Sequence, residues 1–473
     1  MSAPVTVAAV DLGATSGRVM LGRVSADGIA LEQVARFAHE PVRLPDGLHW
    51  DLLHLYASAL DGLRAAAASA PLDGIGIDSW AVDYGLLRGD ALVGLPYAYR
   101  DERGARGVEA VHAVVPFAEL YGRNGLQFLP FNTLYQLAAE TPSGLGAERF
   151  LMLPDLLAFW LTGERVNEVT NASSTGLLDP RTGTWDTDLM GRLGIPASLF
   201  GPLVQPGDRI GALTGHAAEM VGAAVPVFAA PSHDTAAAVL AVPMDPTRAA
   251  YISCGTWGLV GVETPAPILT DAAREANFTN EGGVDGTTRF LRNVMGLWIL
   301  TETLRGWERE GRPVDLTDVL AAATAEPEPA HLFDVDDARF LPPGDMPARI
   351  ASWLTERGLP VPASQPALVR LILESLADAF ARTALLAGEL SGIPIAQIHI
   401  VGGGSLNELL CARTAARAGV PVLAGPVEAT ALGNVLAQAR GLGLPGGLAD
   451  LRDLVARSTS PRRHEPGHLV PTS

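Results

Sequence analysis

Residues 5–24, VTVAAVDLGATSGRVMLGRV, decide the fold class of this chain. Two apolar runs flank a short Gly/Ser/Thr turn, a pattern that predicts a β-hairpin. Residues 249–262, AAYISCGTWGLVGV, repeat the design about half a chain later. The pattern alone also allows two unrelated hairpins. Its recurrence favours two related α/β domains that face each other across a cleft.

The boundary between these domains is expected in AVPMDPTRA, 241–249, where two prolines and an aspartate interrupt the apolar pattern. We therefore expect domains over 1–242 and 243–473. Within them, helical spacing or strand–turn–helix patterns are expected in five segments: 52–70, 149–164, 367–390, 395–419 and 427–443. Residues 100–150 are expected to be rich in loops, and the polar tail 458–473 to fray.

Composition narrows the class of protein. The chain has 473 residues, 48% hydrophobic and 18% charged, which are values of globular proteins with sizeable cores. Its formal charge of -18 repels nucleic acid and anionic membranes. The N-terminus lacks the basic segment of a signal peptide, and no apolar run is long enough to span a membrane. Cys254 and Cys411 are too few for a disulfide scaffold. We expect a cytoplasmic protein with neither nucleic acid nor membrane as partner.

Lysine is missing from the sequence, and all 34 basic residues are arginines. A P-loop needs a lysine on the phosphates, protein kinases need a strand lysine, and Schiff-base chemistry needs an amine. All three classes are therefore excluded.

Three glycine-rich turns are candidate phosphate or nucleotide sites. In the first, Asp11 ends an apolar strand before the turn 13–17, whose small residues let backbone amides approach a polyphosphate beside a hydrated Mg²⁺. The second turn, SCGTWG, offers Gly255 and Thr256 without a carboxylate. The third, IVGGGSLN, opens the backbone at 402–404 before a helix. An ordinary tight turn explains each one almost as well.

Two further stretches carry titratable groups. In SHDTAAAVLAV, 232–242, Asp234 is expected at a helix start, as a cap or as a general base. His233 is either a substrate ligand or a core histidine. In GIDSWAVD, 76–83, Asp78 and Asp83 accompany Trp80 in a pattern typical of sugar sites, although a loop cap and a core tryptophan also explain it.

Taken in order, the motifs DLGATSGR, GIDSWAVD, FLPFNTLYQL, SHDTAAAV, SCGTWG, RNVMGLW, VGGGSLN and VEATALGN resemble those of the FGGY carbohydrate kinases, over roughly residues 5–440. The glycine-rich turns resemble the whole actin-like ATPase superfamily. GIDSWAVD, FLPFNTLYQL and RNVMGLW are similar to the members that phosphorylate L-rhamnulose at O1.

The resemblance implies roles for individual residues. Asp234 is implied to be the catalytic base, and Asp11 to lie near Mg²⁺. ATP is implied to contact Gly13, Ala14, Thr15, Ser16, Gly17, Thr256, Thr301, Gly402 and Gly403. The sugar is implied to contact Ala81, Asp83, His233 and Asn293. Ala81 stands where the family commonly has glycine, and Thr301 where it usually has glutamine.

The resemblance also implies two ribonuclease H-like α/β domains with ATP, Mg²⁺ and a small ketose meeting in the central cleft. The chain is expected to be a monomer or homodimer. Other ketoses, such as L-fuculose or a ketopentose, stay open as substrates. So do a non-catalytic sugar or nucleotide sensor and an actin-like filament protein on the same fold.

Overall fold

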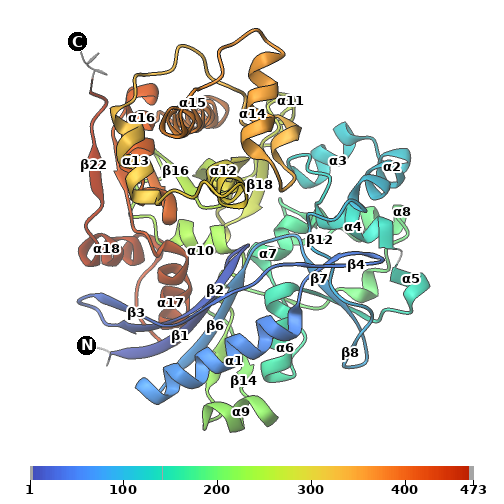
Figure 1. Ribbon diagram of the computed structural model, residues 1–473. Coiled ribbons are helices and arrows are strands. Elements are labelled where there is room, and N and C mark those ends of the chain that lie inside the picture. The colour runs from blue at the N-terminus through green and yellow to red at the C-terminus, as the bar shows by residue number, and fades with distance from the viewer. Residues whose placement is uncertain (1–3, 141, 468–473) are drawn as a thin grey trace. The chain divides into compact units, whose positions relative to one another are not determined.

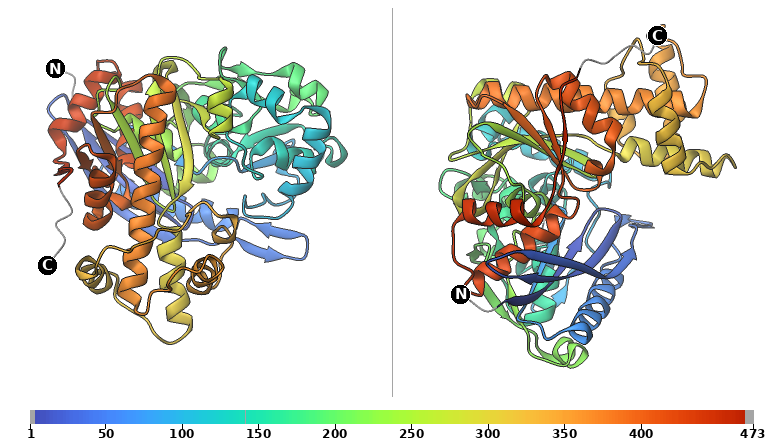
Figure 2. Two further views of the ribbon diagram at one scale, coloured as in Figure 1. Left: turned by 90° about the horizontal axis from the view of Figure 1, so that it is seen from above. Right: turned by 90° about the vertical axis from the view of Figure 1, so that its left-hand side faces the viewer.

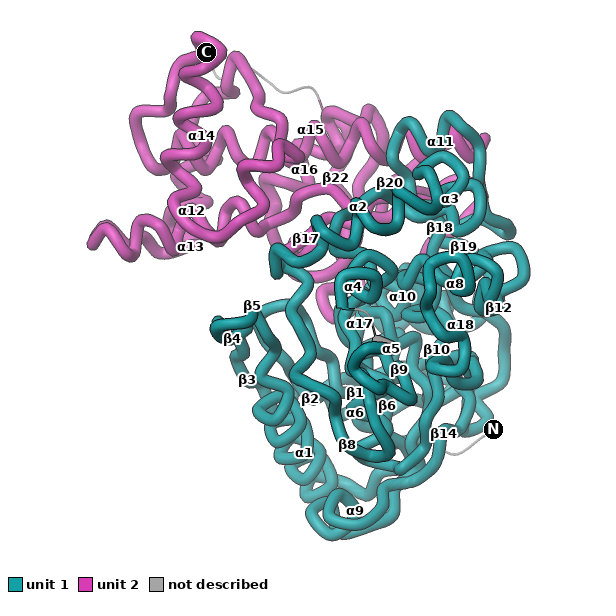
Figure 3. Tube along the Cα trace, turned by 90° about the vertical axis from the view of Figure 1, so that its right-hand side faces the viewer, with its two compact units in different colours: residues 1–243, 263–290, 429–459 teal, residues 244–262, 291–428, 460–473 magenta. Residues whose placement is uncertain are grey.

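The computed structural model describes residues 4–140 and 142–467 (Figure 1). The chain divides into two compact units, coloured separately in Figure 3. Unit 1 combines Met1–Pro243, Glu263–Phe290 and Ala429–Thr459. Unit 2 combines Met244–Val262, Leu291–Glu428 and Ser460–Ser473. Each unit therefore contains stretches that lie far apart in the sequence.

A mixed six-stranded sheet is the centre of unit 1. In spatial order its strands are β14 (Arg209–Ala212), β15 (Pro226–Phe228), β6 (Gly74–Ser79), β1 (Val5–Leu12), β2 (Ser16–Val24) and β3 (Ile29–Ala38). Strand β1 pairs antiparallel with β2 and parallel with β6, and β6 pairs parallel with β15. The parallel strands β1 and β6 end at the same edge, which brings Asp11 next to Asp78.

Helices cover both faces of this sheet. They are α1 (Leu52–Ser69), α6 (Leu153–Thr162) and α9 (Gly215–Val221) on one side, and α10 (Asp234–Leu240) and α17 (Ala429–Gly441) on the other. Figure 2 shows α1 running along the strands. Close packing depends on glycine. A Cβ at Gly62 of α1 would lie 2.4 Å from Val19, and one at Gly22 of β2 would lie 2.6 Å from Val435 of α17.

Short elements make up much of the rest of unit 1. They are β4 (Val42–Leu44), β5 (Gly47–His49), β7 (Tyr84–Arg88), β8 (Ala91–Leu92), α2 (Gly104–Val114), α3 (Phe117–Asn124), α4 (Thr133–Glu140), α5 (Pro142–Leu145), β9 (Arg149–Met152), β10 (Asn167–Glu168), α7 (Val169–Ala172), β11 (Leu178–Asp179), β12 (Thr184–Trp185), α8 (Thr187–Arg192), β13 (Leu203–Val204), α11 (Asp271–Glu275) and α18 (Leu448–Ser458).

A second sheet has seven strands. Its spatial order is β18 (Thr279–Gly282), β19 (Thr288–Met295), β17 (Trp257–Thr264), β16 (Ala249–Cys254), β20 (Gln397–Val401), β21 (Val422–Ala424) and β22 (Arg462–His464). The helices of unit 2 are α12 (Trp298–Arg309), α13 (Leu316–Ala325), α14 (Met346–Thr355), α15 (Gln365–Ser391) and α16 (Glu408–Ala418). Helix α15 packs on β16 and α16, with Phe380 lying where a Cβ at Gly258 would be.

The structure confirms both predicted hairpins, β1–β2 and β16–β17, which are antiparallel pairs. It also confirms helices or strand–helix units in all five predicted segments. Asn407, at the position where a Rossmann fingerprint would have its third glycine, is the N-cap of α16 and accepts from the Leu410 amide. The mixed α/β fold class is therefore confirmed.

Two local predictions are wrong. Residues 100–150, expected to be rich in loops, contain the helices α2 to α5. Gly107 of α2 lies at a contact between helices, because a Cβ there would lie 1.7 Å from the Tyr135 carbonyl oxygen of α4. Within the tail, Arg462–His464 do not fray but form β22 on the edge of the second sheet. The tail's last residues, 468–473, lie outside the described residues.

No helix in the described part of the chain is long and apolar enough to cross a membrane.

Candidate active site

The turn between β1 and β2 is held by its own backbone and by Arg18. The Gly13 amide donates to the Ser16 carbonyl at 3.0 Å, which closes the turn. Arg18 faces Asp11 across the hairpin and donates to its Oδ2 from Nε at 2.9 Å and from a terminal nitrogen at 2.8 Å. Both of these bonds go to one carboxylate oxygen, and Oδ1 takes part in neither. Arg18 is therefore an ion-pair residue of the hairpin.

The two glycines of this turn, Gly13 and Gly17, differ in how strictly packing requires a glycine. A Cβ at Gly17 would lie 2.4 Å from the Phe37 ring, so packing under the hairpin requires glycine there. A Cβ at Gly13 would lie 3.3 Å from the Ser16 carbonyl oxygen, a tight but milder contact. Packing therefore requires glycine strictly at position 17 and less strictly at position 13.

Asp78 forms a buried carboxyl group next to Asp11. The two residues are register partners on parallel strands, so their side chains lie on one face of the sheet. Asp78 is fully buried, and its Oδ2 accepts from Asn434 Nδ2 of α17 at 2.6 Å. Burial, and then the charge of Asp11, hold the pKa of Asp78 well above its usual range. The role of Asn434 was not predicted, because only the tertiary structure brings α17 to this sheet edge.

The GIDSWAVD segment leaves β6 and forms, with Trp50, a largely buried aromatic wall in which Trp50 is 3% and Trp80 6% exposed. Asp83, fully buried, accepts from the indoles of Trp50 and Trp80 at 2.6 Å and 2.9 Å. It also accepts from the Tyr99 amide and Gln136 Nε2, both at 3.2 Å. Burial raises the pKa of Asp83 to about 6, although these hydrogen bonds lower it. Three of these four donors bond to Oδ2, and only Gln136 bonds to Oδ1.

The backbone between Ala81 and Asp83 is strained. Val82 has φ of 67°, a left-handed conformation that is rare for a β-branched residue and costs on the order of 1–3 kcal/mol. Thr133 Oγ1 donates to the Val82 carbonyl at 2.8 Å, which holds the bend in place. The Asp83 amide donates to the Ala81 carbonyl across the bend at 2.9 Å. Strain of this kind is typical of functional sites.

The segment that carries His233 and Asp234 is fixed to its surroundings by buried polar groups. Glu168 Oε2 accepts from the Ser232 amide at 2.9 Å and from the Ser232 hydroxyl at 3.0 Å. Asn171 donates to the Ser232 carbonyl at 3.2 Å, and so does the Ser79 amide of β6 at 2.9 Å. Sequence patterns missed Glu168 and Asn171, because the polar run around them, NEVTNASST, is typical of a surface loop and yet lies buried.

Asp234 is the first residue of α10, one position after the N-cap His233. Its side chain is 31% exposed and accepts from its neighbour Thr235 Oγ1 at 3.2 Å. Burial raises the pKa of Asp234, the adjacent His233 lowers it, and the charge of Asp11 raises it further. Asp234 is thus a partly accessible carboxylate at a helix N-terminus, whose pKa is shifted toward that of a better base.

Charged groups lie on both sides of the His233 ring. Arg289 lies 3.0 Å and Glu281 3.3 Å from Nδ1, and these two residues pair with each other at 3.1 Å. On the other side of the ring, Nε2 lies 3.4 Å from Asp234 Oδ1. His233 therefore connects the Arg289–Glu281 pair to the carboxylate of Asp234.

The nucleotide-type turns predicted for the other half of the sequence lie in unit 2. In the β16–β17 turn, the Gly255 amide donates to the Trp257 carbonyl at 2.9 Å. Beside β20, Gly402 has φ of 79°, and a Cβ at Gly404 would lie 2.2 Å from Cys254 Sγ. A Cβ at Gly403 or Gly255 would meet nothing within 4 Å. Packing thus explains Gly402 and Gly404, whereas Gly403 and Gly255 face open space.

The predicted site residues therefore fall into two groups. Unit 1 contains the carboxylate-rich group of Asp11, residues 13–17, Ala81, Asp83, His233 and Asp234. Unit 2 contains Thr256, Asn293 on β19, Thr301 on α12, Gly402 and Gly403. Among the described residues, no cluster of three His, Cys, Asp or Glu is arranged to hold a metal ion.

The oxygen ligands at Asp11 suit a hard cation, but they are too few to enclose one. Mg²⁺ in proteins usually keeps water and substrate phosphate oxygens beside one or two carboxylates. Asp11, with one oxygen outside its ion pair, fits that kind of partial site.

Comparison with known proteins agrees with this geometry. The model of the FGGY family of carbohydrate kinases, N-terminal domain, matches residues 6–241, and the C-terminal domain model matches 250–442. A rhamnulokinase of Bacteroides thetaiotaomicron is 40% identical, covering 98% of this chain and 96% of the relative. A rhamnulokinase of Pectobacterium atrosepticum is 42% identical, covering 97% and 93%.

Solved structures agree at the level of the fold. A gluconate kinase from Lactobacillus acidophilus has a TM-score of 0.78 at 16% identity, covering 98% of this chain and 94% of its own. A xylulose kinase from Rhodospirillum rubrum has a TM-score of 0.77 at 20% identity, with the same coverage. Given a family model across each half of the sequence and relatives aligned over nearly its whole length, the chain belongs to the FGGY family of carbohydrate kinases.

Proposed function

We propose that this chain transfers the γ-phosphoryl group of ATP to O1 of L-rhamnulose. One observation carries the choice of sugar: the identity of about 40% with rhamnulokinases over 98% of the chain. The geometry of unit 1 supports the reaction, because it supplies a partly exposed carboxylate of raised pKa beside a phosphate-type turn.

Asp234 acts as the general base in this proposal. As the O1 oxygen attacks the γ-phosphorus in line, its proton passes to Asp234, and the bond between phosphorus and the bridging oxygen of ADP breaks. His233 Nε2 lies 3.4 Å from Asp234 Oδ1, so a proton on that nitrogen orients the carboxylate. The Glu168 and Asn171 bonds to Ser232 fix where this segment lies. Positioning of this kind supplies much of the acceleration in phosphoryl transfer.

The remaining site residues take the roles that the family resemblance implies. Backbone amides and hydroxyls of 13–17 hold phosphates, and Thr256, Thr301, Gly402 and Gly403 hold other parts of the nucleotide. Ala81, Asp83, His233 and Asn293 form the sugar site, with Asp83 acting chiefly through Trp50 and Trp80. Asp11 would hold Mg²⁺, which when bound neutralises charge on the phosphates. The functional halves 1–242 and 243–473, the cytoplasmic location and the monomeric or dimeric state stay predictions.

A ketose panel in an ADP-release assay tests the substrate. We expect L-rhamnulose to give the highest kcat/KM, above L-fuculose and the ketopentoses. A different preferred ketose would overturn the substrate and keep the kinase reaction. Sugar binding without turnover in ATP and Mg²⁺ would instead indicate a sensor.

The variant Asp234→Asn tests the base. Loss of a general base typically costs 10²–10⁴-fold, so we expect kcat to fall roughly 10³-fold while sugar still binds. Asp271→Asn is the matched control, because its side chain is 82% exposed on α11, and it should keep full activity. Near-normal sugar-dependent ADP release by Asp234→Asn would contradict the assignment.

A further inference from the structure

His39 contacts the phosphate-type turn at two points. It follows the last residue of β3 and is only 4% exposed. Its amide donates to the Thr15 carbonyl at 3.3 Å, and its Nε2 donates to the Gly13 carbonyl at 2.8 Å. Two carbonyls of one tight turn are therefore bonded to a single residue.

The chemistry of this contact defines the state of the ring. A carbonyl only accepts, so Nε2 carries the proton. Burial lowers the pKa of His39, although the Gly13 bond raises it, which favours the neutral ring. Nδ1 is then a buried acceptor, and it has no hydrogen-bond partner among the described residues. A buried acceptor without a partner destabilises the fold, so packing and the Gly13 bond must hold the ring in place.

The same ring packs on the aromatic wall of the sugar site. Its centroid lies 5.4 Å from that of Trp80 in a stacked arrangement, and 5.5 Å from that of Trp50, edge to face. The two tryptophans lie 4.3 Å apart and both donate to Asp83. His39 therefore contacts the phosphate-type turn through hydrogen bonds and the aromatic wall through its ring.

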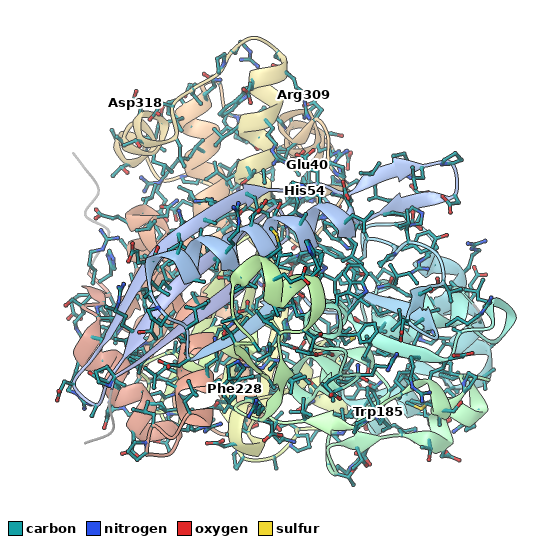
Figure 4. The ribbon with its side chains drawn as sticks, turned by 90° about the horizontal axis from the view of Figure 1, so that it is seen from below. Glu40, His54, Trp185, Phe228, Arg309 and Asp318 are labelled. Atoms are coloured by element: carbon teal, nitrogen blue, oxygen red, sulfur yellow. The ribbon has the colours of Figure 1, made fainter. Side chains whose placement is uncertain are left out.

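The backbone just before His39 is held by contacts from helix α1. His54 of α1, labelled in Figure 4 together with Glu40, bonds the Ala38 carbonyl through Nε2 at 3.0 Å. It also packs edge-on against Phe37, whose ring fills the space beside Gly17. The segment around His39 therefore has little freedom to absorb a shift of the tryptophans, and such a shift is passed to the turn.

We propose that His39 is a positioning residue that couples occupancy of the sugar wall to the conformation of the phosphate-binding turn. The proposal rests on the proposed function. Trp80 is 6% exposed, so a ketose reaches it only at that small part, beside Ala81. A ketose held there restricts the tryptophan pair, the pair fixes the His39 ring, and the ring fixes the Gly13 and Thr15 carbonyls. The amides of the turn are then set for the phosphates before ATP binds. Ketose and ATP therefore favour each other's binding, by the same factor in either order.

Two variants of His39 separate its hydrogen bond to Gly13 from its stacking on Trp80. His39→Phe keeps a ring against Trp80 and loses the bond to Gly13. His39→Gln keeps an amide donor for Gly13 and loses the stacking. His216→Gln is the control, because His216 is 71% exposed on α9, far along the chain from this contact. Thermal unfolding reports whether each variant is folded.

The measurement is the Kd of a non-hydrolysable ATP analogue with Mg²⁺, by calorimetry, with and without saturating L-rhamnulose. In the wild-type chain and in His216→Gln we expect the sugar to tighten binding at least fivefold, within the usual range of coupling. In both His39 variants we expect a factor below about two. Only His39→Phe should also weaken the analogue in the absence of sugar, since it alone loosens the turn.

Three results would overturn the proposal: a coupling factor near one in the wild-type chain, an unchanged factor in either folded His39 variant, or loss of coupling in the control. If neither His39 variant folds, Trp80→Leu at saturating sugar replaces them, and full coupling in that variant overturns the proposal. A wild-type chain that phosphorylates no ketose refutes the proposed function instead. Normal ketose phosphorylation with unchanged coupling refutes only the role of His39.

Discussion

The turns of the hairpins β1–β2 and β16–β17 are held by different kinds of hydrogen bond. Each hairpin is an antiparallel pair in which two turn carbonyls accept hydrogen bonds from outside the turn. In the first, the carbonyls of Gly13 and Thr15 accept from His39. In the second, the Gly255 carbonyl accepts from the Leu297 amide at 3.0 Å, and that of Thr256 from the Trp298 amide at 3.2 Å.

The two hairpins differ in the groups that donate to these turn carbonyls. The second turn depends on backbone amides at the start of α12, which any sequence supplies as long as Gly296 allows the close approach. The first turn depends on one residue, His39, which uses its imidazole for Gly13 and its backbone amide for Thr15. The first hairpin also carries Asp11, where the second has Ser253. Side-chain substitutions should therefore disrupt the first hairpin, and changes that displace the backbone should disrupt the second.

Asp11→Asn should give the largest effect within this comparison. Loss of the carboxylate beside a metal–phosphate group removes about 3 kcal/mol of transition-state stabilisation, or roughly 100-fold in kcat/KM. Ser253→Ala, at the corresponding position of the second hairpin, should change kcat/KM less than about threefold. Steady-state kinetics with ATP varied at saturating sugar measures both. Equal losses in the two variants would show that the hairpins do the same work.

Gly296→Ala should damage the second hairpin. A Cβ there would lie 2.4 Å from the Trp257 carbonyl carbon and 2.7 Å from the Thr256 carbonyl oxygen, so α12 must move off the turn. Overpacking of this kind costs about 1–3 kcal/mol, and we expect the KM for ATP to rise roughly tenfold. Gly191→Ala on α8, whose Cβ would meet nothing within 4 Å, is the matched control. A normal KM in Gly296→Ala, with unchanged Tm, would contradict the backbone-tie interpretation.

Hydroxyl removal should affect both hairpins alike and only slightly. Ser16→Ala and Thr256→Val each remove one neutral donor, worth about 0.5–1.5 kcal/mol, or roughly 2- to 10-fold in the KM for ATP. The sum of the two effects in the double variant would show that the hydroxyls act independently. A much larger loss at one position would mean that this turn has a role beyond phosphate contact.

The pH dependence of kcat should respond to a substitution in the first hairpin and not to one in the second. Asp234 must be deprotonated to act as base, so kcat falls as the pH drops through its raised pKa. Burial is the main cause of that rise, and the charge of Asp11 adds to it. In Asp11→Asn the acidic limb should therefore move to lower pH, whereas in Ser253→Ala it should stay. An unmoved limb in Asp11→Asn would mean that the two carboxylates do not interact.

Much of the fold was predictable because its hairpins and long helices follow from patterns within short stretches of sequence. Alternating apolar runs around small polar turns predicted both hairpins, and helical spacing predicted α1 and α15. The prediction failed for α2, where Gly107 is a contact point between helices and not a breaker. A glycine marks a turn where the backbone conformation requires it. It marks a contact between helices where a neighbouring segment leaves no room for a Cβ. Only the tertiary structure shows which of the two applies.

The candidate site was predictable in its motif residues and not in what supports them. Asp11, Asp83, His233 and Asp234 stand in short recognisable stretches. Trp50, His39 and Glu168 do not, because their partners come from elements distant in sequence. No periodicity connects Glu168 to Ser232, which lie 64 residues apart and share a buried hydrogen bond.

The sequence by itself determined the class of this protein: two lysine-free phosphate-type hairpins in an acidic α/β chain, with a carboxylate at a helix start. Only the tertiary structure decided which groups surround that chemistry, such as Asn434 on Asp78, Arg289 on His233, and His39 between the turn and the tryptophans. The physical reason is that a strand or turn forms from contacts along a few residues, whereas the pKa, tautomer and freedom of a side chain depend on what burial brings against it.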